Sequence, residues 1–306
     1  MRICYAGDSA GTNMAAPELN VIHNTRLDGL AQPVQVIAIT GGKGGVGKTS
    51  VAVNLATALA ARERRVVLLD GDLGLANADV FLGLSPRYTL AHVLSGERTL
   101  DEIMVQAPQG FQLIPAAAGA ADLAQLGATE HLGLVQAFSA LATRLDVLIV
   151  DTAAGISHSV LQFSQAAQQV LVVICDEPAS ITDAYALVKV LSRNHGVQRF
   201  RVLANQVRFS GGGTELFQRF QRVAARFLDV TLEYAGEIPE DECLRRSVRG
   251  QRPVLDEFPG SPAARAFKKL AAHADTWPIP AGPRGNVEFF VERLVRRPLV
   301  RPQVVR

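Results

Sequence analysis

The sequence predicts an α/β fold in which a mostly parallel, twisted sheet is covered by helices on both faces. Continuous apolar runs of strand length alternate along the chain with segments of helical apolar spacing, a pattern typical of parallel sheets that are buried on both sides. The chain has 306 residues, of which 48% are hydrophobic and 20% charged, so it can bury a substantial core. We therefore expect one large domain that binds its ligand at the carboxyl ends of the strands.

The strands and helices of this domain are predicted from apolar runs and apolar periodicity. Helical spacing is found in residues 182–191, 215–228 and 263–274, and the glycine-rich residues 210–213 are predicted to form a flexible loop. Residues 1–32 show no sustained period and are predicted to be a flexible extension. The buried strands are expected at residues 34–39, 65–70, 146–151, 170–175 and 200–205.

The most specific motif is the glycine-rich stretch TGGKGGVGKTS at residues 40–50, between the first strand and a helix-like segment. Its residues 42–49 meet the pattern G-x-x-x-x-G-K-[ST], in which backbone N–H groups and a helix N-terminus converge on phosphate oxygens. Lys48 is expected to reach the β- and γ-phosphates, and the Thr49 hydroxyl to ligate Mg²⁺. The predicted nucleotide-binding residues of this P-loop are Gly42, Lys43, Gly44, Gly45, Val46, Gly47, Lys48, Thr49 and Ser50.

The front of this loop resembles the deviant Walker A motif of the MinD/ParA family of P-loop ATPases, through the run KGGVGKT at residues 43–49. The resemblance implies ATP or ADP with Mg²⁺ as cofactors. It also implies an ATP-dependent homodimer, in which Lys43 reaches the phosphates held by the other subunit. The alternative for Lys43 is a solvated loop lysine. The resemblance covers residues 34–295 and places an ATPase domain at residues 33–275.

Two acidic segments follow buried strands, and they resemble the Switch I and Walker B–Switch II segments of that family. An isolated Asp after a strand is ordinarily a helix cap or a turn residue. The resemblance implies that Asp72 orients the attacking water, that Asp70 belongs to the metal shell, and that Asp151 holds Mg²⁺ together with Thr49. Phosphoryl transfer depends mainly on positioning and charge neutralisation. The predicted catalytic residues are therefore Lys43, Lys48 and Asp72.

Two further places resemble those at which the family contacts adenine. Asn205 follows a predicted strand, and the run IPED ends at Asp241. The resemblance implies adenine contacts by Asn205, Pro239, Glu240 and Asp241, although Asn after a strand is also a normal turn residue.

No competing chemistry assembles in the sequence. The six histidines are dispersed without metal-ligand spacing, and Cys4, Cys175 and Cys243 form no C-x-x-C pair. The net charge of +2 is too small to attract nucleic acid by long-range forces, and we expect no direct nucleic-acid partner. No run approaches the roughly 18 apolar residues of a membrane span. We expect a cytoplasmic protein, with a peripheral place at the inner membrane or the cell pole as the alternative.

The tail, residues 276–306, is predicted to be a linker rich in proline and glycine followed by an amphipathic helix. Trp277 is expected to anchor the linker on the surface. Apolar residues at helical spacing in residues 287–295 predict the helix, which Pro298 ends. Two alternatives stay open: the helix packs permanently on the domain, or it is released and binds a membrane surface weakly.

Within the family, the chain resembles the regulators of flagellar number, through residues 70–77, 151–156, 175–187 and 283–294. This implies that the dimer restrains a flagellar transcription activator of the FleQ type. Residues 177–185 and the helix after them follow a strand end next to the switches, and we expect them to form part of the contact surface. A polar signal-recognition-like GTPase is a further implied partner, but the N-terminal motif by which many relatives stimulate it is not found in residues 1–32. The alternatives are a MinD-type division-site ATPase at the membrane and a ParA-type partitioning ATPase.

Overall fold

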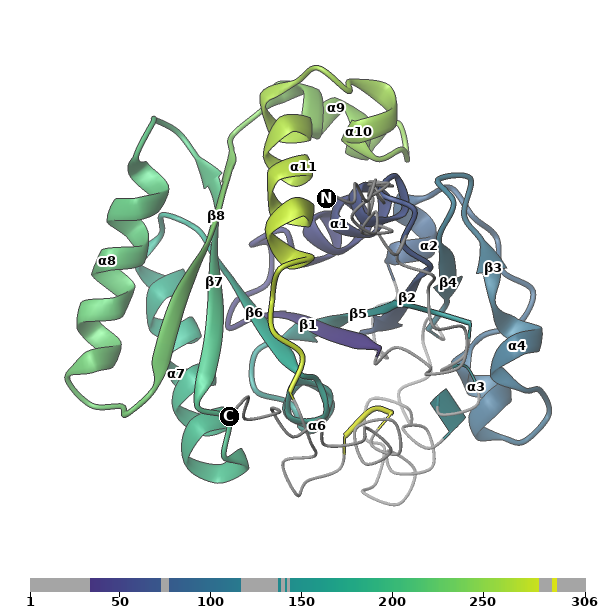
Figure 1. The fold of residues 1–306 in the computed structure, drawn as a ribbon, viewed down its shortest axis with the longest axis horizontal. Helices are drawn as coiled ribbons and strands as arrows, with labels where there is room; N and C mark the ends of the chain where they lie inside the picture. The colour runs from purple at the N-terminus through teal and green to yellow at the C-terminus, as the bar shows by residue number, and fades with distance from the viewer. Residues whose placement is uncertain are drawn as a thin grey trace, which may run out of the picture. The chain divides into compact units, whose positions relative to one another are not determined.

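An eight-stranded sheet forms the centre of the computed structural model, with strand order β3-β4-β2-β5-β1-β6-β7-β8 (Figure 1). The structure describes residues 34–72, 77–116, 137–138, 141, 144–280 and 288–290. All neighbouring strands are parallel except β3 and β4. The strands are β1 (Gln35–Gly41), β2 (Val66–Gly71), β3 (Val105–Gln106), β4 (Gln112–Ile114), β5 (Val147–Ala154), β6 (Gln169–Ile174), β7 (Arg199–Val207) and β8 (Thr231–Pro239).

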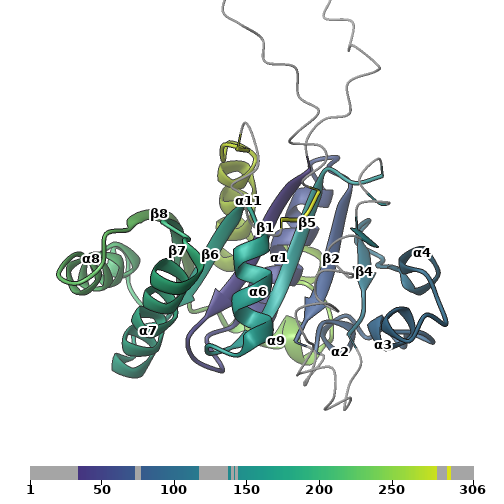
Figure 2. The ribbon, with the colours of Figure 1, turned by 90° about the horizontal axis from the view of Figure 1, so that it is seen from below.

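Helices cover both faces of this sheet, which confirms the predicted fold class. Alternate residues of β1 enter different apolar clusters: Ile37 and Ile39 pack with α1 and α11, whereas Val36 and Ala38 face the other way. Figure 2 shows α6 and α7 on the face opposite α1 and α11. The helices are α1 (Lys48–Ala60), α2 (Ala78–Phe81), α3 (Leu90–Leu94), α4 (Leu100–Ile103), α6 (His158–Ala166), α7 (Pro178–His195), α8 (Gly212–Ala225), α9 (Glu242–Arg249), α10 (Val254–Glu257) and α11 (Pro262–Ala274).

The predicted strands are all present, as β1, β2, β5, β6 and β7, and the predicted helices are α7, α8 and α11. The prediction of a loop at residues 210–213 holds for the turn at residues 210 and 211 but is wrong at Gly212 and Gly213, because α8 begins at Gly212. A Cβ at Gly213 would lie 2.3 Å from the Glu237 carboxylate, so this glycine lets α8 approach β8 closely. Glycine here serves helix packing and not chain flexibility.

The start of the tail is anchored as predicted. Trp277 is buried, with the guanidinium of Arg201 4.4 Å from the centre of its ring. Gln169, on β6, donates a hydrogen bond of 2.7 Å to the carbonyl of Pro278. These contacts fix the chain across the amino-terminal ends of the central strands.

A second part of the tail, residues 288–290, is also packed on the domain. Phe289 and Phe290 are buried, and the backbone N–H of Phe289 donates to Ala166 at the end of α6. Phe290 has a φ of 56° and the chain turns there, so the predicted helix is wrong at these residues: a left-handed residue interrupts the helical hydrogen bonds. The rest of that helix, and residues 1–32, lie outside the described residues.

Candidate nucleotide-binding and active site

The P-loop connects the end of β1 to the start of α1 by a backbone path that requires glycine. Gly45 and Gly47 have φ values of 81° and 90°, in the left-handed region that other residues rarely occupy. Gly47 directly precedes Lys48, the first residue of α1. The helix therefore begins at the loop, with its unpaired N–H groups and positive dipole end directed at the place where a phosphate would bind.

Close packing holds this loop from two sides. A Cβ at Gly42 would lie 2.1 Å from the carbonyl carbon of Asp183 in α7, and one at Gly47 would lie 2.4 Å from Nδ2 of Asn205. The Asn205 amide also donates a hydrogen bond of 2.8 Å to the carbonyl of Val46. The loop is thus clamped between α7 and the end of β7.

Two buried carboxylates face each other where β2 and β5 run side by side. Asp70 and Asp151 are paired in the strand register, and they are 1% and 2% exposed. Burial and the charge of Asp70 raise the pKa of Asp151 to about 8, against the hydrogen bond from the Thr49 hydroxyl and the charge of Lys48. Burial also raises the pKa of Asp70, to about 6.

The Asp70 carboxylate supports the chain around Switch I. It accepts hydrogen bonds of 3.0–3.1 Å from the backbone N–H groups of Asp72, Asn77 and Ala78. These bonds occupy both of its oxygens. Any metal role for Asp70 is therefore that of an outer support, in keeping with the predicted metal shell.

Lys48 lies between the P-loop and the acidic strand ends. Its side chain is buried, and burial lowers the pKa of its ammonium while the charges of Asp151 and Asp72 raise it. The fold thus brings Lys48, Asp72 and Asp151 into electrostatic contact across three elements. An ammonium in this position is directed at charge that a bound phosphate would supply.

The oxygen atoms at this point fit a magnesium ion. Oδ1 of Asp151 and Oγ of Ser50 are buried, and neither has a hydrogen-bond partner. The Thr49 hydroxyl bonds to Asp151. Carboxylate and hydroxyl oxygens are ligands of the kind that Mg²⁺ prefers, together with water and phosphate.

Switch II is tied to the P-loop through the backbone. The N–H of Gly155 donates to the carbonyl of Gly41 at 3.1 Å, and the Thr152 hydroxyl donates to the carbonyl of Ile39 at 3.1 Å. The segment that follows Asp151 is therefore held against the end of β1, where the P-loop begins.

Lys43 stands at the exposed front of the loop. Its ammonium forms an ion pair with the Glu177 carboxylate at the start of α7. That hydrogen bond, and then the charge of Glu177, raise the pKa of Lys43. No sequence motif identifies this partner, although Glu177 follows a predicted strand as Asp72 does.

The carboxylates of the predicted adenine contacts at the end of β8 already have protein partners. Glu240 pairs with Arg245 at 2.7 Å and with Arg208 at 3.3 Å. Asp241 accepts from the backbone N–H of Cys243 at the start of α9 and from that of Ala263 in α11. These carboxylates have structural tasks, and adenine contact by this segment stays a prediction.

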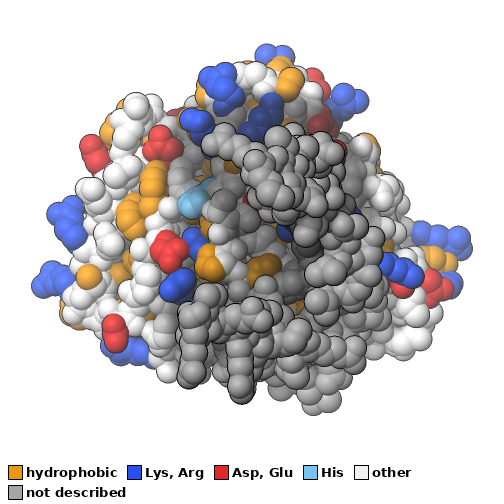
Figure 3. All heavy atoms as spheres, in the orientation of Figure 1, with side chains coloured by type: hydrophobic (Ala, Val, Ile, Leu, Met, Phe, Trp, Pro, Cys, Tyr) orange, Lys and Arg blue, Asp and Glu red, His pale blue; other side chains and the backbone are white. Residues whose placement is uncertain are grey.

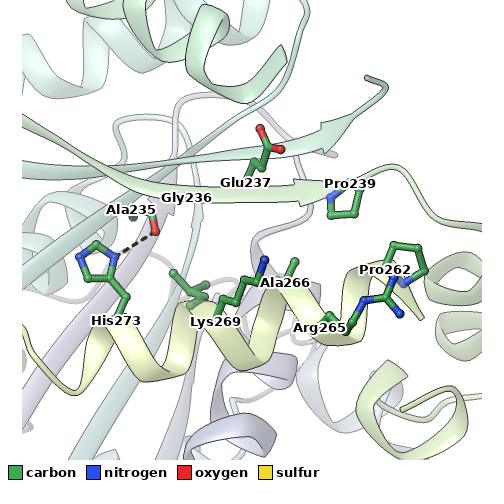
Figure 4. A pocket seen from close by; sticks show the side chains of 10 residues that line it. Ala235, Gly236, Glu237, Pro239, Pro262, Arg265, Ala266, Lys269 and His273 are labelled. Atoms are coloured by element: carbon green, nitrogen blue, oxygen red, sulfur yellow. Dashed lines mark hydrogen bonds between the residues drawn. The ribbon is translucent and has the colours of Figure 1, made fainter. Parts of the chain in front are cut away.

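Pro239 lines a pocket of about 420 Å³ between β8 and α11 (Figure 4). Lys269 and His273 of α11 contribute to its wall, whereas the Glu237 side chain lies on the other side of β8.

Further basic side chains gather at the end of the molecule formed by α9 and α10 (Figure 3). Among these, Arg245 and Arg252 are in ion pairs with neighbouring glutamates.

Comparisons with known proteins agree with this geometry. Residues 37–254 match the family described as the CobQ/CobB/MinD/ParA nucleotide binding domain. The antiactivator FleN of Pseudomonas aeruginosa is 57% identical over 270 residues, which cover 88% of this chain and 96% of that protein. The flagellum site-determining protein YlxH of Helicobacter pylori is 32% identical, with coverages of 85% and 89%. The solved structure of the septum site-determining protein MinD from Pyrococcus horikoshii, complexed with Mg-ADP, matches with a TM-score of 0.67 and 27% identity, covering 79% of this chain and 96% of that one.

Proposed function

This chain belongs to the CobQ/CobB/MinD/ParA nucleotide-binding family, and from that premise we propose that it is an ATP-dependent dimerisation switch that limits flagellar number. It is an ATPase of the MinD/ParA type, and members of this family dimerise. In the proposed function, the ATP-bound dimer restrains a flagellar transcription activator of the FleQ type. The observation that carries the proposal is the 57% identity with the antiactivator FleN across nearly the whole of that protein.

The residues of the site divide the chemistry among them. The oxygens of Thr49 and Asp151 would hold Mg²⁺, which when bound would neutralise phosphate charge. Lys48, whose ammonium is buried, binds the phosphates from the start of α1. Asp72 orients water, and Lys43 contacts the phosphates of the second subunit. These residues and the metal ion are sufficient for slow ATP hydrolysis. The rate of hydrolysis then determines how long the dimer lasts.

The enzymatic part is tested by the variant Asp72→Ala in steady-state ATPase assays. We expect turnover to fall by about 10²-fold, with the affinity for ADP retained, because Asp72 orients water and does not bind the nucleotide. Asp79→Ala, an acid of α2 whose carboxylate accepts from Val80, is the matched control and should hydrolyse ATP normally. Unchanged turnover in Asp72→Ala would show that Asp72 does not orient the attacking water.

The regulatory part is tested by a pull-down of a FleQ-type activator with the protein in ATP and in ADP. We expect a complex that depends on ATP. Absence of a complex in every nucleotide state would contradict the proposal. Binding to liposomes that requires residues 286–306 would instead support the MinD-type alternative, and salt-sensitive binding to DNA would support the ParA-type alternative. Binding of a signal-recognition-like GTPase is measured in the same assay.

A further inference from the structure

The N-cap position of α7, directly before Pro178, holds an acidic side chain, Glu177, that does not cap its own helix. A residue at the N-cap position commonly accepts a hydrogen bond from a free N–H of the first turn. The Glu177 side chain makes no such bond, and its carboxylate pairs with the ammonium of Lys43 in the P-loop. The acid at this position is therefore directed at the nucleotide site.

The backbone around Glu177 is fixed. Its N–H donates to the carbonyl of Cys175 at 2.7 Å, and the N–H of Cys175 donates to the hydroxyl of Ser180 at 3.1 Å. Ser180 is buried. At the other side of the pair, Gly42 packs directly against Asp183 of α7. Glu177 and Lys43 thus stand on two segments that cannot separate without disrupting close packing.

The neighbouring acid provides a contrast. Asp176 pairs with Arg219 of α8 at 2.8 Å, away from the loop. Glu177 supplies the largest electrostatic influence on Lys43, and Asp183 adds a smaller one. Of the two adjacent acids, only Glu177 forms an ion pair with the P-loop.

We propose that Glu177 is a positioning residue that holds Lys43 within its own subunit, and so raises the ATP concentration that dimerisation requires. This inference rests on the proposed function, in which Lys43 contacts the phosphates of a second copy of the chain. The pair with Glu177 holds the Lys43 ammonium against α7 of its own subunit, so moving that ammonium toward a phosphate of the second copy weakens this contact. Both side chains are partly exposed, so the pair is weak enough to exchange, and it shifts the equilibrium only modestly.

The test is Glu177→Gln, with Asp176→Asn as the matched control. Dimerisation is followed by sedimentation velocity during titration with a non-hydrolysable ATP analogue. We expect Glu177→Gln to lower the analogue concentration at half-maximal dimerisation by about two- to fivefold, the range that an exposed ion pair supports. The affinity of the monomer for ADP should be unchanged, and Asp176→Asn should dimerise like the wild type.

Further variants connect the effect to Lys43. Glu177→Asp, which keeps the charge on a shorter side chain, should fall between the wild type and Glu177→Gln, and it carries the test if Glu177→Gln does not fold. Adding Glu177→Gln to Lys43→Ala should not improve dimerisation. High salt should reduce the difference between Glu177→Gln and the wild type.

The inference is overturned if the wild type dimerises with the analogue and Glu177→Gln needs the same or a higher concentration. It is also overturned if Glu177→Gln improves dimerisation in the Lys43→Ala background. A wild type that stays monomeric at saturating analogue contradicts the proposed function itself, so the two failures can be distinguished.

Discussion

Two regions at the carboxyl edge of the same sheet differ in whether their polar side chains have hydrogen-bond or ion-pair partners within the protein. Around β1, β2 and β5, oxygens of Asp151 and Ser50 are buried without a partner, and Lys48 is buried with a lowered pKa. At the end of β8, both oxygens of Asp241 accept backbone hydrogen bonds and Glu240 is in ion pairs. The first region has buried oxygens that a ligand or metal ion could contact, whereas the carboxylates of the second region are already bonded within the protein.

The difference has an energetic meaning. A buried polar group without a partner costs roughly 1–3 kcal/mol, so each such group calls for an explanation, and contact with a bound ion or ligand is one. Both regions are predicted to bind nucleotide, the first by the specific P-loop motif and the second only by its resemblance to the family's adenine contacts. Variants in the two regions should therefore separate loss of nucleotide affinity from loss of stability.

The largest effect is expected for Lys48→Ala. We expect the affinity for ADP to fall by about 10²-fold, because the ammonium faces the phosphates. We also expect no loss of folding stability, because burial disfavours the charged form of Lys48. Fluorescence titration with labelled ADP and urea denaturation without nucleotide measure the two. An affinity within threefold of wild type would show that Lys48 contributes little to nucleotide binding.

Asp241→Ala should have the reverse effect. It removes the cap of α9 and the hydrogen bond to Ala263 in α11, and we expect the free energy of unfolding to fall by about 1–2 kcal/mol. The affinity for ADP, measured at a temperature where the variant is folded, should stay within about twofold. A larger loss of affinity would show that this segment contacts the nucleotide after all.

The contribution of Asp241 should depend on pH. Burial raises the pKa of its carboxyl, but the hydrogen bonds from Ala263 and Cys243 outweigh burial and hold that pKa below its usual value. A carboxyl with a lowered folded pKa stabilises the protein above its unfolded pKa, and this contribution is lost as pH falls through the folded value. The stability difference between wild type and Asp241→Ala should therefore be full at pH 7 and shrink below about pH 4. A difference that stays constant would point to a packing effect.

The smallest effect is expected for Glu240→Ala. Its ion pairs with Arg245 and Arg208 are exposed, and exposed pairs contribute little to stability. We expect no measurable change in the urea midpoint or in ADP affinity. A clear loss of ADP affinity would support the prediction that Glu240 contacts adenine.

Local sequence patterns predict five of the eight strands, whereas β3, β4, β8 and the contacts between the site and its neighbours are not predicted. The apolar strands and the P-loop are local patterns, because strand burial and loop geometry require particular residues at fixed spacing. The ion pair of Glu177 with Lys43 joins residues 134 positions apart, and no local pattern predicts it. The helical Gly212 and Gly213 escape prediction for the same reason, since the partner of Gly213 lies on β8.

The amino-acid sequence by itself determined that this chain forms a P-loop fold, with Lys48, Thr49, Asp72 and Asp151 at strand and helix ends, because each of those positions follows from local chemistry. Only the tertiary structure decided which buried polar groups have no hydrogen-bond partner within the protein. Asp151 retains an oxygen without a partner, whereas Asp241 has both of its oxygens occupied by helices that follow it in the chain. Hydrogen-bond partners are assigned by packing across the sheet, and sequence spacing does not encode that packing directly.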